Sequence, residues 1–121
     1  MRALRAYKIV EELKLDENAS ARLFPVLAKF DEREMVLAAQ RRDIIRELRE
    51  QVESSHPDDG RIGKAIERLL ANRARRHELR DEQIKEVRRV LTPVQQAKLV
   101  LLLPRLERDF AQWVHESSGR D

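Results

Sequence analysis

The chain contains no cysteine, which excludes disulfide bonds and any thiolate that could act in catalysis or bind a metal. Aromatic residues make up only 4% of the sequence, so few side chains are available to stack on nucleic-acid bases. Three glycines and four prolines among 121 residues leave little material for turns. The longest apolar run, Leu99–Leu103, is far shorter than the roughly 20 residues of a membrane-spanning helix. We therefore expect no membrane insertion.

Charged residues, in contrast, make up 39% of the chain, and this composition is typical of long helices rich in Ala, Glu, Lys, Arg and Leu. Such helices have narrow apolar stripes and bury little surface per residue. We therefore expect the protein to gain further burial as a homodimer. The length predicts a single helical domain over 1–121, with a core at 16–115 and a disordered tail at 116–121.

Apolar residues at helical spacing predict four helices, at about 3–13, 17–54, 60–90 and 93–115. Along the second helix they recur every three, four or seven residues, a period close to that of packed long helices. The third helix draws its expected apolar face from seven residues: Ile62, Ile66, Leu69, Leu70, Ile84, Val87 and Val90.

Two prolines lie inside these helices and predict irregularities. Pro25 should bend the second helix, and Pro104 should kink or split the last one after Leu103. The loop Ser54–Gly60 is the one clear turn. The expected fold is therefore all-α: an elongated antiparallel hairpin of two long bent helices, with a short N-terminal helix and a kinked C-terminal helix.

The segment Leu91-Thr92-Pro93-Val94-Gln95 carries the clearest local signal. Thr92 suits a helix N-cap, Pro93 suits the first helical position, and Gln95 can bond back to the Thr92 backbone N–H. Asp16 is expected to cap the second helix in the same way, and Asp58 or Asp59 to cap the third.

Positive charge is concentrated in one segment. The net charge is +3, yet residues 61–90 carry 10 basic and 5 acidic side chains. Arg73, Arg76 and Arg80 are our candidates for electrostatic contact with a partner, because the guanidinium group pairs well with carboxylates. A nucleic-acid-binding protein is one alternative, but the interleaved acidic residues weaken the field and we expect no nucleic-acid partner.

Little in the sequence indicates catalysis or a cofactor. The serines and glycines form no nucleophile elbow or phosphate-binding loop, and the paired carboxylates are interleaved with Arg and Lys, so we expect no enzyme and no cofactor. The three histidines His56, His77 and His115 are not clustered at the spacing of a zinc site. His56, Asp58 and His77 are weak metal candidates, and with His115 they would need to converge across a dimer.

The Leu91–Gln95 segment, placed between long charged helices, resembles the LTxxQ-motif family of small periplasmic helical proteins, which includes the Spy and CpxP stress proteins and related heavy-metal-resistance sensors. The likeness in helix order extends over about residues 13–115. Family members commonly carry a second motif before the first long helix. Here the matching Leu15–Ala19 keeps a capping residue at Asp16, and Ala19 stands in place of the glutamine.

This resemblance implies a curved, cradle-shaped antiparallel homodimer with a basic concave face. It also implies ATP-independent binding of unfolded or envelope-stress proteins, or of a sensor partner. A metal-responsive periplasmic sensor is the alternative within the family. We expect a periplasmic protein whose leader precedes Met1, and a cytoplasmic location stays open.

Overall fold

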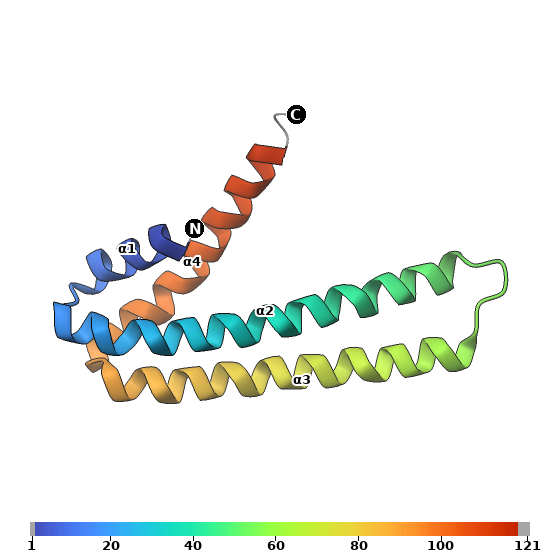
Figure 1. The fold of residues 1–121 in the computed structure, drawn as a ribbon, viewed down its shortest axis with the longest axis horizontal. Coiled ribbons are helices and arrows are strands. Elements are labelled where there is room, and N and C mark those ends of the chain that lie inside the picture. Colours follow the sequence, from blue (N-terminus) through green and yellow to red (C-terminus); the bar gives the residue numbers. More distant parts are fainter. Residues whose placement is uncertain (1, 119–121) are drawn as a thin grey trace. The chain divides into compact units, whose positions relative to one another are not determined.

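A computed structural model describes the backbone of residues 2–118 and the side chains of residues 5–105 (Figure 1). Within this range the chain consists of four helices and no strand, which confirms the all-α prediction. These are α1 (Arg2–Leu13), α2 (Glu17–Glu53), α3 (Asp59–Val90) and α4 (Pro93–Ser118). No helix among the described residues has both the length and the hydropathy needed to cross a membrane.

α2 and α3 begin directly after their predicted capping residues. The backbone N–H of Ala19 donates a hydrogen bond to Asp16 Oδ1 at 2.7 Å, and the N–H of Arg61 donates to Asp58 Oδ1 at 3.1 Å. Each carboxylate satisfies an amide that has no partner within its own helix. Asp58, not Asp59, is therefore the cap of α3.

Both internal prolines lie within unbroken helices. α2 continues through Pro25, and α4 continues through Pro104 without the split expected after Leu103. α4 also extends to Ser118, so residues 116–118 of the expected tail are helical. A bend or kink at either proline stays a prediction.

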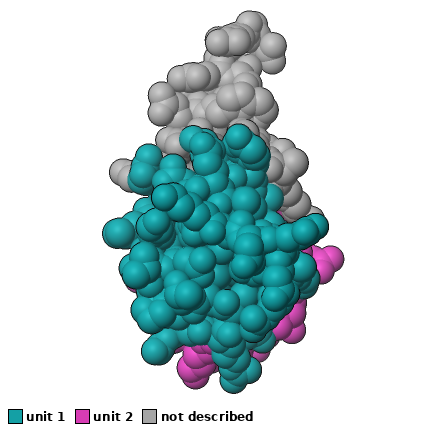
Figure 2. All heavy atoms as spheres, turned by 90° about the vertical axis from the view of Figure 1, so that its left-hand side faces the viewer, with its two compact units in different colours: residues 1–25, 86–121 teal, residues 26–85 magenta. Residues whose placement is uncertain are grey.

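The chain divides into two compact units, residues 1–25 with 86–121 and residues 26–85 (Figure 2). In the first, here unit 1, α1 packs against α4. Because α1, α4 and the adjoining ends of α2 and α3 each contribute one apolar face, unit 1 has a shared core. Its buried side chains are Ile9, Leu13, Leu15, Leu23, Val87, Leu91, Leu99 and Leu102.

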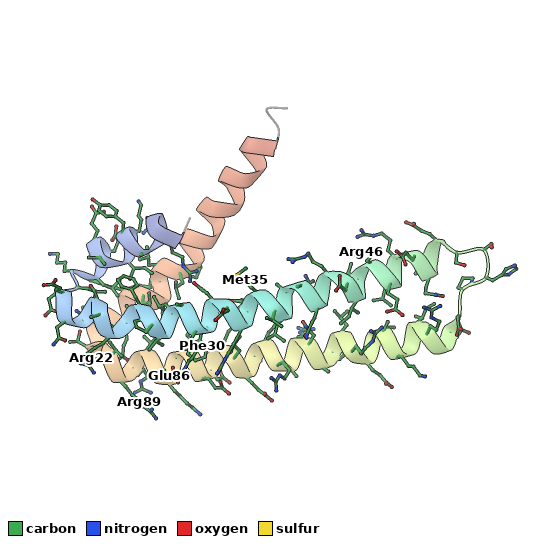
Figure 3. The ribbon with its side chains drawn as sticks, in the orientation of Figure 1. Arg22, Phe30, Met35, Arg46, Glu86 and Arg89 are labelled. Carbon is green, nitrogen blue, oxygen red and sulfur yellow. The ribbon has the colours of Figure 1, made fainter. Side chains whose placement is uncertain are left out.

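The second unit, here unit 2, contains the remaining lengths of α2 and α3 with the loop between them. Arg33 pairs with Glu82 at 3.7 Å, while Glu47 pairs with Arg68 farther along α2 and nearer the start of α3, so the two segments run antiparallel. Phe30 points from α2 toward α3, whereas Met35 points away from it (Figure 3).

The turn between α1 and α2 contains the one described non-glycine residue with a positive φ, Lys14 at 52°. The N–H of Leu15 donates to the carbonyl of Val10 at 3.2 Å, five residues back. This is the Schellman pattern that ends many helices, and glycine is the usual residue at the left-handed position. Leu15 is buried, so the apolar contact that accompanies the motif anchors the turn in unit 1.

Replacing Lys14 by glycine should therefore stabilise the protein by about 0.5–1 kcal/mol, because glycine adopts the left-handed conformation without steric strain. Urea denaturation followed by circular dichroism measures the change in the free energy of unfolding. Lys8, exposed within α1, provides the control: Lys8→Gly should destabilise by about 1 kcal/mol. Equal losses in both variants would show that the backbone at Lys14 is unstrained.

Candidate functional site

The seam between the paired helices of unit 2 follows an alternating spacing of three and four residues, as in antiparallel coiled coils. On α2 the seam positions are 30, 34, 37, 41, 44 and 48, and on α3 they are 65, 69, 72, 76, 79 and 83. Phe30, Ile44 and Ala65 are buried there. The middle of the seam, however, is occupied by polar residues: Glu34, Arg41, Asn72 and Arg76.

Asn72 is the most deeply buried polar residue of the described chain, with only 5% of its surface exposed. Its Nδ2 donates a hydrogen bond to the backbone carbonyl of Leu37 at 2.9 Å, while its Oδ1 is buried and accepts none. One turn later Arg76 is half-buried and pairs with Glu34 at 3.8 Å, and its Nε has no partner among the described residues. These polar groups interrupt the apolar contact between the helices.

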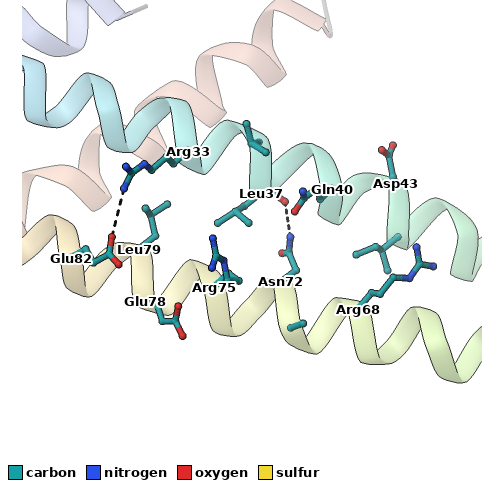
Figure 4. Close-up of a pocket in the computed structure, with 13 residues that line it drawn as sticks. Arg33, Leu37, Gln40, Asp43, Arg68, Asn72, Arg75, Glu78, Leu79 and Glu82 are labelled. Carbon is teal, nitrogen blue, oxygen red and sulfur yellow. Dashed lines mark hydrogen bonds and ion pairs between the residues drawn. The ribbon is translucent and has the colours of Figure 1, made fainter.

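An open groove of about 930 Å³ lies along one side of this seam (Figure 4). Its apolar lining comes from both helices and includes Leu37 and Leu79, which face each other across the gap, together with the exposed Val36. The groove is shallow and lined by helix surfaces on both sides, so it is shaped for a long, flat contact more than for a small molecule.

The charged residues that line the groove are balanced in sign: Arg33, Arg68 and Arg75 against Asp43, Glu78 and Glu82. Four of them are already paired. Arg33 bonds with Glu82, Arg68 with Glu47 and Asp43 with Arg46. Arg75 and Glu78 are exposed and make no ion pair with any described residue. They are the free charges of the groove.

A different face of α3 displays apolar residues to solvent. Ile66, Leu70 and Ile84 are 44%, 58% and 51% exposed. The sequence predicts these three on the buried face of this helix, and the structure corrects that prediction. The reason is that the apolar residues of α3 fall on two faces, and α2 covers only one of them. Arg73, His77 and Arg80 lie between them at spacings of three and four residues, so all six share one side of the helix.

We call this set of residues the α3 stripe: Ile66, Leu70, Arg73, His77, Arg80 and Ile84. Two of the three candidate arginines, Arg73 and Arg80, belong to it and are exposed. The third, Arg76, occupies a seam position and is engaged by Glu34, so it is not part of the same surface. The stripe combines apolar side chains with fixed positive charge.

The weak metal candidates lie apart within unit 2. His56 is exposed in the loop, where its backbone N–H donates to Ser54 Oγ at 3.1 Å, and the Asp58 carboxylate caps α3. His77 lies in the middle of α3, roughly 27 Å along the helix axis from the start of α3. No group of three or more potential ligands occurs among the described residues, and His115 lies outside the described side chains.

The Thr92 motif joins α3 to α4 within unit 1. The N–H of Thr92 donates to Gln95 Oε1 at 3.0 Å, and the N–H of Gln95 donates to Thr92 Oγ1 at 3.3 Å, so the reciprocal bonds of a capping box are present. Pro93 is the first residue of α4, and Leu91 is buried in the core of unit 1. The motif therefore fixes the start of α4.

A residue beyond the motif completes the junction. The side-chain Nε2 of Gln96 donates to the carbonyl of Leu91 at 2.8 Å and to the carbonyl of Arg88 at 3.3 Å. Arg22 contributes from α2 by donating to the carbonyl of Arg89 at 3.4 Å (Figure 3). The carbonyls of Arg88 and Arg89 lie in the last turn of α3 and that of Leu91 directly after it, where no later residue of the helix can donate to them. Sequence reasoning missed Gln96 and Arg22 because no local spacing rule pairs either residue with the end of the preceding helix.

Asn72→Leu should raise the free energy of unfolding by about 1 kcal/mol, since leucine removes a buried acceptor that has no partner and adds apolar contact in the seam. Asn72→Ala should lower it, because alanine leaves a gap. Urea denaturation of the three proteins measures both changes. If Asn72→Leu destabilised the protein, the hydrogen bond from Asn72 to the Leu37 carbonyl would contribute more stability than the unpaired Oδ1 costs.

Gln96→Ala should destabilise the protein by about 1 kcal/mol, because carbonyls at the end of α3 lose their donor. Thr92→Ala should lose a similar amount through the cap of α4, whereas Thr92→Ser keeps the hydroxyl and should lose little. Thermal unfolding monitored by circular dichroism compares the variants. Val94→Ala, at an exposed neighbouring position, serves as the control, and a Gln96→Ala protein as stable as this control would contradict the assignment.

Comparison with known proteins shows no family model, no curated protein and no solved structure that matches this chain. The function must therefore be inferred from the residues of this chain. Two surfaces of unit 2, the groove and the α3 stripe, and one junction in unit 1 are the features to be explained.

Proposed function

We propose that the protein is a periplasmic, ATP-independent, chaperone-like stress-response protein that binds unfolded or envelope-stress proteins. The observation that carries this proposal is the α3 stripe, in which three large apolar side chains are about half exposed and share one side of the helix with two arginines. Exposed apolar residues grouped on one surface are a usual mark of a partner-binding site. The site needs no nucleotide, cofactor or metal to bind a protein chain.

The stripe suits an unfolded partner for two physical reasons. Its apolar residues are spread over 19 residues of helix, from Ile66 to Ile84, so they offer several weak contacts to an extended chain. Arg73 and Arg80 add positive charge that attracts acidic segments over a distance of several ångströms. Neither kind of contact requires a partner of fixed shape, so the stripe is suited to binding many different unfolded proteins.

The proposal extends to the architecture that the family resemblance implies. The two long helices would form a bent hairpin, two copies of the chain would form a cradle, and the Leu91–Gln95 motif would hold α4 in place. A sensor protein is a further partner in this scheme. Support comes from the motif, whose hydrogen bonds are formed, and from the helix order.

The proposal predicts that the protein suppresses aggregation of a chemically denatured model protein when the two are mixed at equimolar ratio. Ile66→Gln combined with Leu70→Gln should raise the concentration needed for half-suppression about tenfold, because two partly buried apolar contacts with the client are lost. Light scattering follows the aggregation. Suppression by the wild type should also weaken as salt is added, because salt screens the arginines.

A matched pair of arginine variants separates the stripe from general charge. Arg73→Ala with Arg80→Ala should weaken suppression, whereas Arg42→Ala with Arg49→Ala removes the same charge from α2 and should have little effect. All four arginines are exposed, so the fold should persist in both double variants. If wild-type protein fails to suppress aggregation at low salt, the proposed function is wrong.

A further inference from the structure

We propose that the groove of unit 2 binds the groove of a second copy of this chain around a two-fold axis, with Arg75 and Glu78 of each copy exchanging ion pairs. The inference rests on the homodimer included in the proposed function and identifies its interface. It assigns the groove to self-association and leaves the α3 stripe, on another face of the same helix, for clients.

The apolar lining of the groove supplies the driving force for such a contact. Val36 is 57% exposed at its edge, and Leu37 and Leu79 are only half-buried between the helices. A third helix laid along a pair of helices covers such residues by the same ridge-and-groove packing that joins the pair. A second copy brings two helices with the same lining, so both grooves would lose their exposed apolar surface in one contact.

The charge balance of the lining favours a second copy over a strongly acidic or basic macromolecule. Three arginines and three carboxylates line the groove, so it has no net charge to attract a partner of one sign. Arg33, Arg68, Asp43 and Glu82 are already engaged within the chain, and a partner that competed for them would break existing ion pairs. The groove of a second copy has its own charges paired in the same way, so it does not compete for these ion pairs.

The two free charges complement each other under two-fold symmetry. Arg75 and Glu78 are three residues apart on one helix, and both line the groove. When two copies of α3 cross antiparallel near this point, a two-fold axis relates them. Any contact of one residue in the first copy with another residue in the second copy then occurs a second time with the copies exchanged. Each Arg75 would then meet the partner's Glu78, so both free charges become paired and the ion pair occurs twice.

Charge reversal tests this pairing directly. Arg75→Glu places carboxylates opposite each other twice, and Glu78→Arg does the same with guanidinium groups. Each single variant should raise the dimer dissociation constant at least about tenfold, whereas the double variant Arg75→Glu with Glu78→Arg restores opposite charges and should dimerise like the wild type. Sedimentation equilibrium at low salt measures all four dissociation constants.

Arg73→Glu is the matched control, because it makes the same charge change two residues away on the α3 stripe and should leave the dissociation constant unchanged. Circular dichroism of each variant checks the helical content, and the exposed position of both residues favours intact folding. The inference is overturned if the wild type is monomeric at about 100 μM, if neither single variant weakens the dimer, or if the double variant fails to restore it.

The aggregation assay distinguishes this result from failure of the proposed function. A monomeric wild type that still suppresses aggregation removes the groove interface and leaves the client-binding stripe. A dimer with the expected charge-reversal pattern and no effect on aggregation supports the interface and removes the function.

Discussion

A layer of two helices buries only one narrow stripe of each helix, and this limit governs what unit 2 exposes. α3 carries apolar residues on more than one face, and α2 can cover a single one. Ala65 and Leu69 turn toward the seam, while Ile66 and Leu70, one residue farther along in each case, do not. Apolar surface therefore stays in contact with water as a direct result of the architecture, and the molecule has an energetic reason to bind other chains.

The polar residues at the centre of the seam weaken the contact between α2 and α3. Asn72 and Arg76 hold buried atoms without partners, so the two helices gain little from contact at this level. Polar residues at seam positions lower stability and favour one alignment of the helices, as in coiled coils. The buried apolar residues Phe30 and Ile44 lie on either side of these polar residues, while Leu37 and Leu79 among them are only half-buried and line the open groove. The apolar residues of the seam therefore stabilise the helix pair, and its polar residues favour one alignment of the two helices.

Much of the fold follows from local rules. The four helices, their caps at Asp16 and Asp58 and the reciprocal bonds of Thr92 and Gln95 depend on spacing within a few residues, and sequence patterns report such spacing directly. The exposed face of α3 could not be obtained in this way, because helical periodicity does not say how many neighbours a helix has. Asn72 bonds to a carbonyl of α2, and Gln96 bonds to a carbonyl just after the end of α3. Neither partner lies in the residue's own helix, so no local pattern reveals these roles.

The junction between α3 and α4 consists of only two residues, Leu91 and Thr92, both fixed by hydrogen bonds. Adding or deleting one residue here would turn α4 by about 100° and replace the buried Leu99 and Leu102 of unit 1 by their neighbours, either Lys98 and Leu101 or Val100 and Leu103. The loop at residues 54–58 is less restricted: its residues are all exposed, and only its last residue, Asp58, is needed to cap α3. A change in chain length should consequently cost less stability in this loop, before Asp58, than at the other end of α3.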